Sequence, residues 1–215
     1  EPLERGFGTT LGNALRRVML SSLPGDAITS VKIDGVAHEF QKLDGVIEDV
    51  TAIVLNLKSV ILKNHSQDEN KILRLSASKE GEVKAGDIEK DADIEILNPE
   101  LVSCTLAEGG SINMELTIGS GRGYVRSEDN KKLYGDKKLN VIYIDSLYSP
   151  IERINYEVEP ARVGQNNTYD KLVMEVWTNG AINPEEAIAL ASRILIEHFE
   201  VLTNLNEIAD TTGLM

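Results

Sequence analysis

The stretch at residues 6–20 reads GFGTTLGNALRRVML and marks a glycine-punctuated turn that leads into a helix. On that helix, apolar residues recur at the spacing i, i+3, i+4 and i+7, which is typical of a face packed on a core. The predicted core face consists of Leu11, Ala14, Leu15 and Val18, with Met19 at its margin. Leu20 falls on the other side, one turn after Arg16 and Arg17. Because arginine beside an apolar anchor is enriched at protein interfaces, we expect that side to bind a partner.

The composition is that of an ordinary globular chain. Its 215 residues are 41% apolar and 27% charged, which allows one large domain or two smaller ones. Apolar runs are only a few residues long and no basic segment leads into one, so we expect neither a membrane span nor a secretory signal. Because the sequence opens on Glu1 rather than Met, we expect a fragment of a longer protein. A single cysteine, Cys104, is typical of a reducing compartment, and we expect the cytoplasm.

The charge balance is strongly acidic. Against 35 Asp and Glu there are 22 Lys and Arg, which gives a net charge of −13. Tight binding to nucleic acid needs clustered positive charge that displaces counterions from phosphates, and the sequence has no dense basic tract. We therefore expect no direct nucleic-acid binding by this segment, and no membrane association.

Helical periodicity lies at the two ends of the sequence, and strand-like alternation fills its middle. The first helix is predicted over residues 9–22 and ends at Leu23-Pro24-Gly25. A second helix is predicted over residues 44–62, and Asp34-Gly35 is typical of a hairpin turn. Strands are predicted at residues 27–34, 36–40, 72–78, 92–97, 101–106, 111–118, 140–147, 152–158 and 171–178.

The last helix has a well-specified start and an unusually wide apolar surface. The run Asn183-Pro184-Glu185-Glu186 supplies an N-cap, a proline at the first helical position and a glutamate for a capping box. Apolar residues then cover well over half of the helix circumference, whereas packing on one core needs a stripe of about 100°. We therefore expect its own sheet to cover one side and a second copy of the chain to cover the other, in a two-fold contact. The residues expected at this dimer interface are Leu11, Leu15, Val18, Ile194, Leu195, His198, Phe199 and Leu202.

The predicted fold class is α+β, with a discontinuous dimerisation domain in which two terminal helices pack on an antiparallel sheet. This domain comprises residues 1–24 and 151–205, a mostly-β domain at residues 25–150 is inserted into it, and residues 206–215 begin a linker. One segment leaves two interpretations open. The alternating residues 149–159 form either an edge strand that adds to a partner's sheet or an internal strand of the core.

Two glycine-rich segments resemble phosphate-binding loops. Gly6, Gly8 and Gly12 have the spacing of a dinucleotide loop, which would place a pyrophosphate at the helix N-terminus. No buried strand is predicted before them and no βαβ unit after them, so a tight turn and close helix packing explain these glycines better. The segment at residues 119–124, GSGRGY, lacks the Gly-Lys-Ser/Thr end of a phosphate loop and predicts a flexible hairpin.

The usual catalytic and metal-binding patterns are missing from the sequence. His38, His65 and His198 are far apart, and no cysteine lies near them at metal-ligand spacing. No G-x-S-x-G nucleophile motif occurs, and acidic pairs fall at predicted helix starts, where they complement the helix dipole. We therefore predict no catalytic residues, no metal and no cofactor.

Residues 3–17, LERGFGTTLGNALRR, closely resemble the N-terminal domain of the bacterial RNA polymerase alpha subunit. Further segments resemble that family in the same order and extend the likeness along the whole chain: residues 149–154, 158–164, 170–176, 178–180 and 184–187. The resemblance implies a non-catalytic subunit of DNA-directed RNA polymerase, a nucleotidyltransferase whose active site lies on its large subunits. Two alternatives remain, a nucleotide-dependent enzyme built on the Gly6–Gly12 loop and a generic dimerisation module.

The same resemblance implies partners and contact residues. It implies a homodimer whose terminal helices pair across a two-fold axis, with one copy bound to the beta subunit and the other to the beta-prime subunit. Polymerase assembly for DNA-templated transcription would then begin on the dimer. The matching positions are Arg17 and Leu20 for beta, and Lys58, Ile151 and Val158 for beta-prime. By this resemblance, the family's first strand would precede Glu1, and its C-terminal DNA-binding domain would follow Met215.

Overall fold

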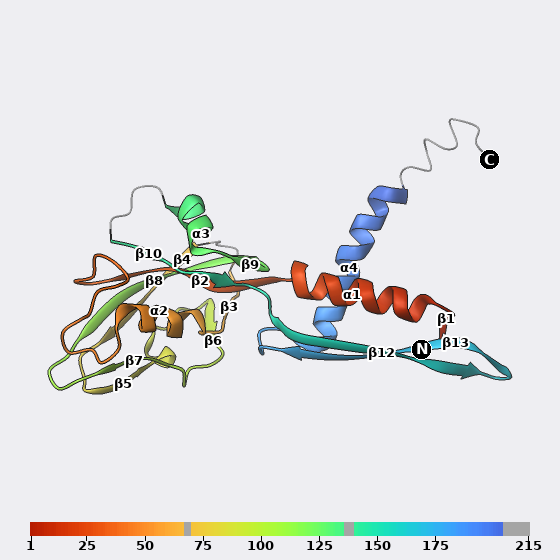
Figure 1. The fold of residues 1–215 in the computed structure, drawn as a ribbon, viewed down its shortest axis with the longest axis horizontal. Helices are drawn as coiled ribbons and strands as arrows, with labels where there is room; N and C mark the ends of the chain where they lie inside the picture. Colours follow the sequence, from red (N-terminus) through yellow and green to blue (C-terminus); the bar gives the residue numbers. More distant parts are fainter. Residues whose placement is uncertain (67–69, 136–139, 204–215) are drawn as a thin grey trace. The chain divides into compact units, whose positions relative to one another are not determined.

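The computed structural model describes residues 1–66, 70–135 and 140–203 of the chain (Figure 1). Helices and antiparallel strands occur together in it, so the predicted α+β class is confirmed. The predicted linker at residues 206–215 lies outside the described part. Within the described part, no helix combines the length and the apolar composition needed to cross a membrane.

Contacts divide the chain into two units. The terminal unit joins Glu1–Leu23 to Pro150–Met215, and the middle unit is Pro24–Ser149. The elements of the terminal unit are β1 (Leu3–Glu4), α1 (Phe7–Ser22), β12 (Ile151–Val163), β13 (Asn166–Thr178) and α4 (Pro184–Thr203). Its sheet has the order β1-β13-β12, and both pairings are antiparallel. Among the described residues β12 is therefore an edge strand, which favours the edge-strand interpretation of residues 149–159.

α1 lies along the hairpin of β12 and β13, and α4 packs on α1 (Figure 1). The buried face of α1 is built around Gly8, Gly12 and Met19. A Cβ atom at Gly12 would lie 2.6 Å from Cδ2 of Tyr156, and a Cβ atom at Gly8 would lie 2.7 Å from Cγ1 of Val158. Glycine at these two positions thus lets the helix approach the sheet more closely than any side chain would allow.

This buried face agrees only in part with the one that the apolar spacing predicts, because Met19 is buried and Leu15 and Val18 pack against the core, but Gly8 and Gly12 were not expected there. Leu11, Ala14, Leu15 and Val18 are only half-buried. Because glycine has no side chain, apolar periodicity does not reveal a helix face that is built on glycine spacing. The prediction for Leu20 is corrected as well, since Leu20 is half-buried and packs against the core of the terminal unit rather than pointing away from it.

We expect Gly12→Ala to lower the free energy of unfolding by about 1–2 kcal/mol, because crowding against Tyr156 and Leu172 outweighs a helix-propensity gain of about 1 kcal/mol. Urea denaturation of both proteins at one chain concentration measures this difference. Asn13→Ala, at the exposed neighbouring position, is the matched control and should not destabilise the protein. A Gly12→Ala protein as stable as the wild type would contradict the close packing.

The middle unit is rich in β-structure. In the described residues its helices are α2 (Val50–Lys58) and α3 (Ser127–Tyr134), with a 3-10 turn at Ala85–Asp87. Its strands are β2 (Pro24–Ile33), β3 (Leu62–Asn64), β4 (Asn70–Ala77), β5 (Gly81–Lys84), β6 (Ile94–Ile96), β7 (Val102–Leu106), β8 (Ile112–Arg122), β9 (Tyr124–Val125), β10 (Ile142–Tyr143) and β11 (Ser146–Leu147). The main sheet has the order β10-β2-β8-β4, and β11 pairs with β9, β3 with β6 and β5 with β7. The core of this unit includes the buried side chains of α2, which packs on β2 and β7.

Two predictions near the start of the middle unit are wrong. Residues 36–40 form a loop rather than a strand, because the side chain of Gln41 hydrogen-bonds the backbone of the loop and satisfies groups that a strand would pair. The helix predicted at residues 44–62 is shorter and begins only at α2. Gly45 has φ +78°, which interrupts a helix, and Asp49 then caps α2 by accepting a hydrogen bond from a backbone N–H at 2.8 Å.

Two further predictions fail later in the middle unit. The segment at residues 119–124 is not a flexible hairpin, because residues 119–122 continue β8 and pair with residues 24–27 of β2. The strand predicted at residues 140–147 is split into β10 and β11, with Asp145 between them. α3 was outside the sequence prediction because its charged sequence has no clear apolar stripe.

Candidate protein-binding surfaces

The glycine loop at the start of α1 holds a carboxylate of the chain itself. Backbone N–H groups of Gly6 and Gly8 donate to Oδ2 of Asp170, at 2.8 and 3.1 Å. Gly6 has φ +91°, a left-handed conformation that favours glycine. A carboxylate is stabilised at a helix N-terminus by the helix dipole and by unpaired N–H groups. Because Asp170 takes donors that a phosphate would need, the geometry favours the turn-and-packing interpretation of these glycines.

α4 has two halves with different surroundings. In the first half Ala187 and Ala191 are buried in the core, and Asn183 accepts a hydrogen bond from the backbone N–H of Glu185 at 3.1 Å, as the predicted N-cap requires. In the second half, which extends away from α1 in Figure 1, every residue at 196–203 is exposed. The large apolar side chains there are exposed by 57% at Ile196, 58% at Phe199, 69% at Val201 and 58% at Leu202.

These four residues, Ile196, Phe199, Val201 and Leu202, are called the α4 row. Part of α1 is uncovered in a similar way, although less completely. Phe7 is 50% exposed, and Leu11, Ala14 and Val18 follow it at i+4, i+7 and i+11 and are half-buried. These four residues are called the α1 row. Exposed apolar side chains as large as Phe7 and those of the α4 row are typical of a surface that binds another protein.

The residues predicted at the dimer interface lie partly in these rows. Those in the rows are Leu11, Val18, Phe199 and Leu202. Leu15, Ile194 and Leu195 lie outside the rows and, like Leu11 and Val18, are half-buried within the terminal unit. His198 is exposed, and its Nδ1 lies 2.7 Å from the carbonyl oxygen of Ile194. The predicted set leaves out Phe7, Ile196 and Val201, which are exposed as well, because periodicity identifies the apolar arc of a helix but not the part of it that the chain's own core covers.

The two residues matched to the beta subunit differ in exposure. Arg17 is exposed and lies about 140° around the helix axis from Gly12, on a side of α1 turned away from the sheet. Leu20 is half-buried against the core, so only part of its side chain is accessible to a partner. The helix therefore exposes Arg17 to solvent, while the face that carries Gly8 and Gly12 packs on the sheet.

The three residues matched to the beta-prime subunit lie in different units. Lys58 ends α2 in the middle unit, whereas Ile151 and Val158 lie on β12 in the terminal unit. Val158 is 37% exposed, and it lies beside Gly8. Ile151 is only 6% exposed and belongs to the core, so its side chain is not part of the surface that the terminal unit presents.

Lys58 belongs to a hydrogen-bond network that could not be predicted from the sequence. Its Nζ lies 3.2 Å from Oδ2 of Asp145 and 5.2 Å from the centre of the Tyr124 ring. Asp145 also accepts hydrogen bonds from the Tyr124 hydroxyl at 2.7 Å and from the backbone N–H of Ser127 at 2.8 Å. The Tyr124 hydroxyl above all, followed by the Ser127 N–H and Lys58, holds the pKa of the Asp145 carboxyl well below its usual range. These partners come from α2, β9 and the start of α3.

Known proteins resemble the chain over its whole length. The family described as the RNA polymerase Rpb3/RpoA insert domain matches residues 31–149, which is more than half of the chain. The DNA-directed RNA polymerase subunit alpha of Symbiobacterium thermophilum is 58% identical over all 215 residues, which cover 67% of that protein. The subunits of the same name from Desulforamulus reducens and Carboxydothermus hydrogenoformans are 56% and 53% identical, with 67% and 68% covered.

The chain belongs to the bacterial RNA polymerase alpha-subunit family. The resemblance seen in the sequence is thereby confirmed. The alpha-subunit relatives are components of DNA-directed RNA polymerase, a nucleotidyltransferase that carries out transcription. The matched segment at residues 31–149 lies within the middle unit, so the network around Asp145 belongs to the insert domain of this family.

Asp145→Asn should lower the free energy of unfolding of this alpha-subunit chain by about 1 kcal/mol near neutral pH, because it removes a charge that Tyr124, Ser127 and Lys58 stabilise. The pKa of Asp145 is depressed, so this contribution is present above the unfolded-state pKa of about 4 and is lost as the pH falls toward the folded-state pKa. Urea unfolding curves of wild type and variant should therefore converge below about pH 4. Asp44→Asn, at an exposed aspartate, is the matched control, and an equal effect of both substitutions would contradict the network.

The surroundings of Cys104 and of His65 bear on whether either could act as a nucleophile or a metal ligand. Cys104 is buried, and burial together with the charge of Glu48 raises the pKa of its thiol to about 11, which disfavours the thiolate that a nucleophile needs. His65 pairs with Glu95 at 3.2 Å on the surface. Within the described residues, His, Cys, Asp and Glu do not gather in a group of three or more that fits a metal ion.

Proposed function

We propose that the chain is a non-catalytic scaffold of bacterial RNA polymerase, which homodimerises and nucleates assembly in the cytoplasm by binding the beta and beta-prime subunits. The observation that carries this proposal is the α4 row, whose large apolar side chains are 57–69% exposed on one half of a single helix. In this proposal residues 1–24 and 151–205 form the dimerisation domain, and residues 25–150 form the insert.

A second copy of the chain is the partner that best fits the α4 row. In a two-fold contact α4 of one copy meets α4 of the other, so the exposed apolar side chains on the facing sides of both helices are covered at once. Burying the exposed parts of four such side chains from each copy contributes on the order of 10 kcal/mol, which is comparable to the cost of association, about 4–15 kcal/mol. The α1 row must therefore add to the contact, and it lies on the helix against which α4 packs.

The large subunits are proposed to bind elsewhere on the chain. Arg17, with the accessible part of Leu20, is proposed to contact beta, since Arg17 is exposed on a side of α1 that the sheet does not cover. Lys58 and Val158 are proposed to contact beta-prime, and both are partly exposed. Ile151 is proposed to act through packing, because its side chain belongs to the core beneath β12.

Affinity capture with purified subunits tests this function. The tagged chain is mixed with purified beta, with purified beta-prime and with both, and the retained subunits are counted after washing. We expect beta to be retained, and beta-prime to be retained when beta is present. A chain that stays dimeric but retains neither large subunit would leave only a generic dimerisation module.

A further inference from the structure

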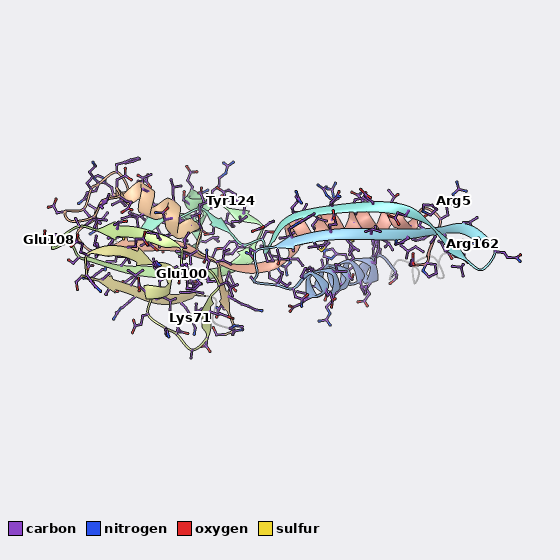
Figure 2. All side chains as sticks on the ribbon, turned by 90° about the horizontal axis from the view of Figure 1, so that it is seen from below. Arg5, Lys71, Glu100, Glu108, Tyr124 and Arg162 are labelled. Carbon is purple, nitrogen blue, oxygen red and sulfur yellow. The ribbon has the colours of Figure 1, made fainter. Side chains whose placement is uncertain are left out.

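Two large side chains of the insert form an exposed patch that the function proposed above does not use. Tyr124 of β9 and Leu147 of β11 are paired in register across an antiparallel ladder. Side chains of residues paired in this way lie next to each other on one face of the ladder. Tyr124, labelled in Figure 2, is 52% exposed, and Leu147 is 57% exposed. An aromatic ring and an aliphatic side chain are thus presented together.

Lys58 extends this patch with a positive charge. Its ammonium group lies 5.2 Å from the centre of the Tyr124 ring, within the range of a cation–π contact. The ammonium has three N–H groups. Within the described part of the chain Lys58 donates to Asp145, which leaves it able to donate to an acceptor on a partner. The surface therefore combines a leucine, an aromatic ring and a cation.

Asp145 joins the polar groups of the patch, because both Lys58 and Tyr124 donate hydrogen bonds to it. Its carboxylate accepts hydrogen bonds from the Tyr124 hydroxyl, the Ser127 N–H and the Lys58 ammonium, which belong to three separate elements. A partly exposed ion pair contributes little to stability by itself. Holding a ring and a long lysine side chain in one arrangement does, however, reduce the ordering cost when a partner binds.

We propose that Tyr124 and Leu147 form, together with Lys58, one contact surface for the beta-prime subunit, with Asp145 as the positioning residue of Lys58 and Tyr124. The proposal rests on the proposed function, because Lys58 is there assigned to beta-prime. The surface is continuous with Lys58, and Tyr124 at its centre belongs to a residue type that is enriched among interface anchors. It fits a segment of beta-prime that presents an apolar side chain to Leu147 and the ring, and a carboxylate or carbonyl oxygen to Lys58.

Leu147→Ala tests the apolar part of the surface. The complex of the chain with beta is titrated with fluorescently labelled beta-prime, and we expect affinity to fall about tenfold. Leu147→Gln should weaken binding as well. Ile47→Ala is the matched control, since Ile47 is 69% exposed in the same unit and precedes the opposite end of α2 from Lys58, and it should leave the affinity unchanged. Because Leu147 is exposed, the thermal midpoint and dimer mass should match the wild type in all three variants.

Asp145→Asn in two backgrounds tests the positioning role. In the wild-type chain this substitution should weaken beta-prime binding about fivefold, which is within the range of a lost charge-assisted contact. In a Lys58→Met, Tyr124→Phe chain it should cause no further loss, because the groups that Asp145 holds are already gone. A merely structural role would give the same loss in both backgrounds and would overturn the positioning assignment.

Failure of the extended beta-prime surface can be distinguished from failure of the scaffold function. If Lys58→Met weakens beta-prime binding but Leu147→Ala does not, or if Ile47→Ala weakens it equally, the extended surface is wrong and the scaffold function stands. If the wild-type complex with beta does not bind beta-prime at all, the scaffold function itself fails.

Discussion

Phe199→Asp is expected to convert the dimer to a monomer. The Phe199 side chain is 58% exposed in the single chain, so the substitution leaves the monomer fold intact, but it places a carboxylate inside the proposed two-fold contact. Each interface then loses two aromatic anchors and gains two charges, which should weaken association by about 4 kcal/mol or more, roughly a thousandfold. Size-exclusion chromatography with light scattering should give the chain mass of 23.6 kDa instead of twice that value.

The matched control for this variant is Ala189→Asp. It introduces the same charge at an exposed position in the first half of α4, outside the α4 row, and should leave the dimer intact. Circular dichroism should show the same helix content in both variants. A Phe199→Asp chain that remains dimeric across a concentration series would show that the α4 row is not the dimer contact.

Arg17→Ala is expected to weaken binding of the beta subunit while the dimer stays intact. Removing an arginine anchor from an interface costs on the order of 2 kcal/mol or more, about thirtyfold in affinity. Arg17 is exposed on a side of α1 remote from its glycine face, so the fold of the terminal unit should not change. Titration of labelled beta with the variant dimer measures the loss.

Arg16→Ala is the matched control for that titration. It removes the same side chain from the adjacent exposed position and should change beta affinity less than Arg17→Ala does. If Arg17→Ala instead dissociates the dimer, the side of α1 assigned to beta is in fact the dimer contact.

The ends of the chain were the most predictable part of the fold, because their signals are local. Asn183 caps α4 as its spacing predicts, and the alternating residues of β12 form a strand. Local sequence patterns were misleading where a side-chain hydrogen bond replaced the backbone pairing or the helical turn that they predict. The side chain of Gln41 closes a loop where a strand was expected, and Asp49 starts α2 later than its apolar spacing suggests.

The surfaces were less predictable than the elements, for two physical reasons. Helix periodicity counts side chains, so it did not reveal the part of the buried face of α1 where Gly8 and Gly12 make the close contact. The network around Asp145 joins Lys58 to a residue 87 positions later, and neither spacing nor composition signals a contact over such a separation. The partner expected from the wide apolar arc of α4 stays a prediction, and the α4 row shows which part of that arc the terminal unit leaves uncovered.

The mass of the complex with purified beta subunit tests the central claim most directly. Mass photometry of the chain mixed with beta should show one beta subunit carrying two copies of the chain, an increase of twice 23.6 kDa over beta alone. A complex that gains the mass of one copy, or beta that gains none, would contradict a dimeric scaffold for polymerase assembly.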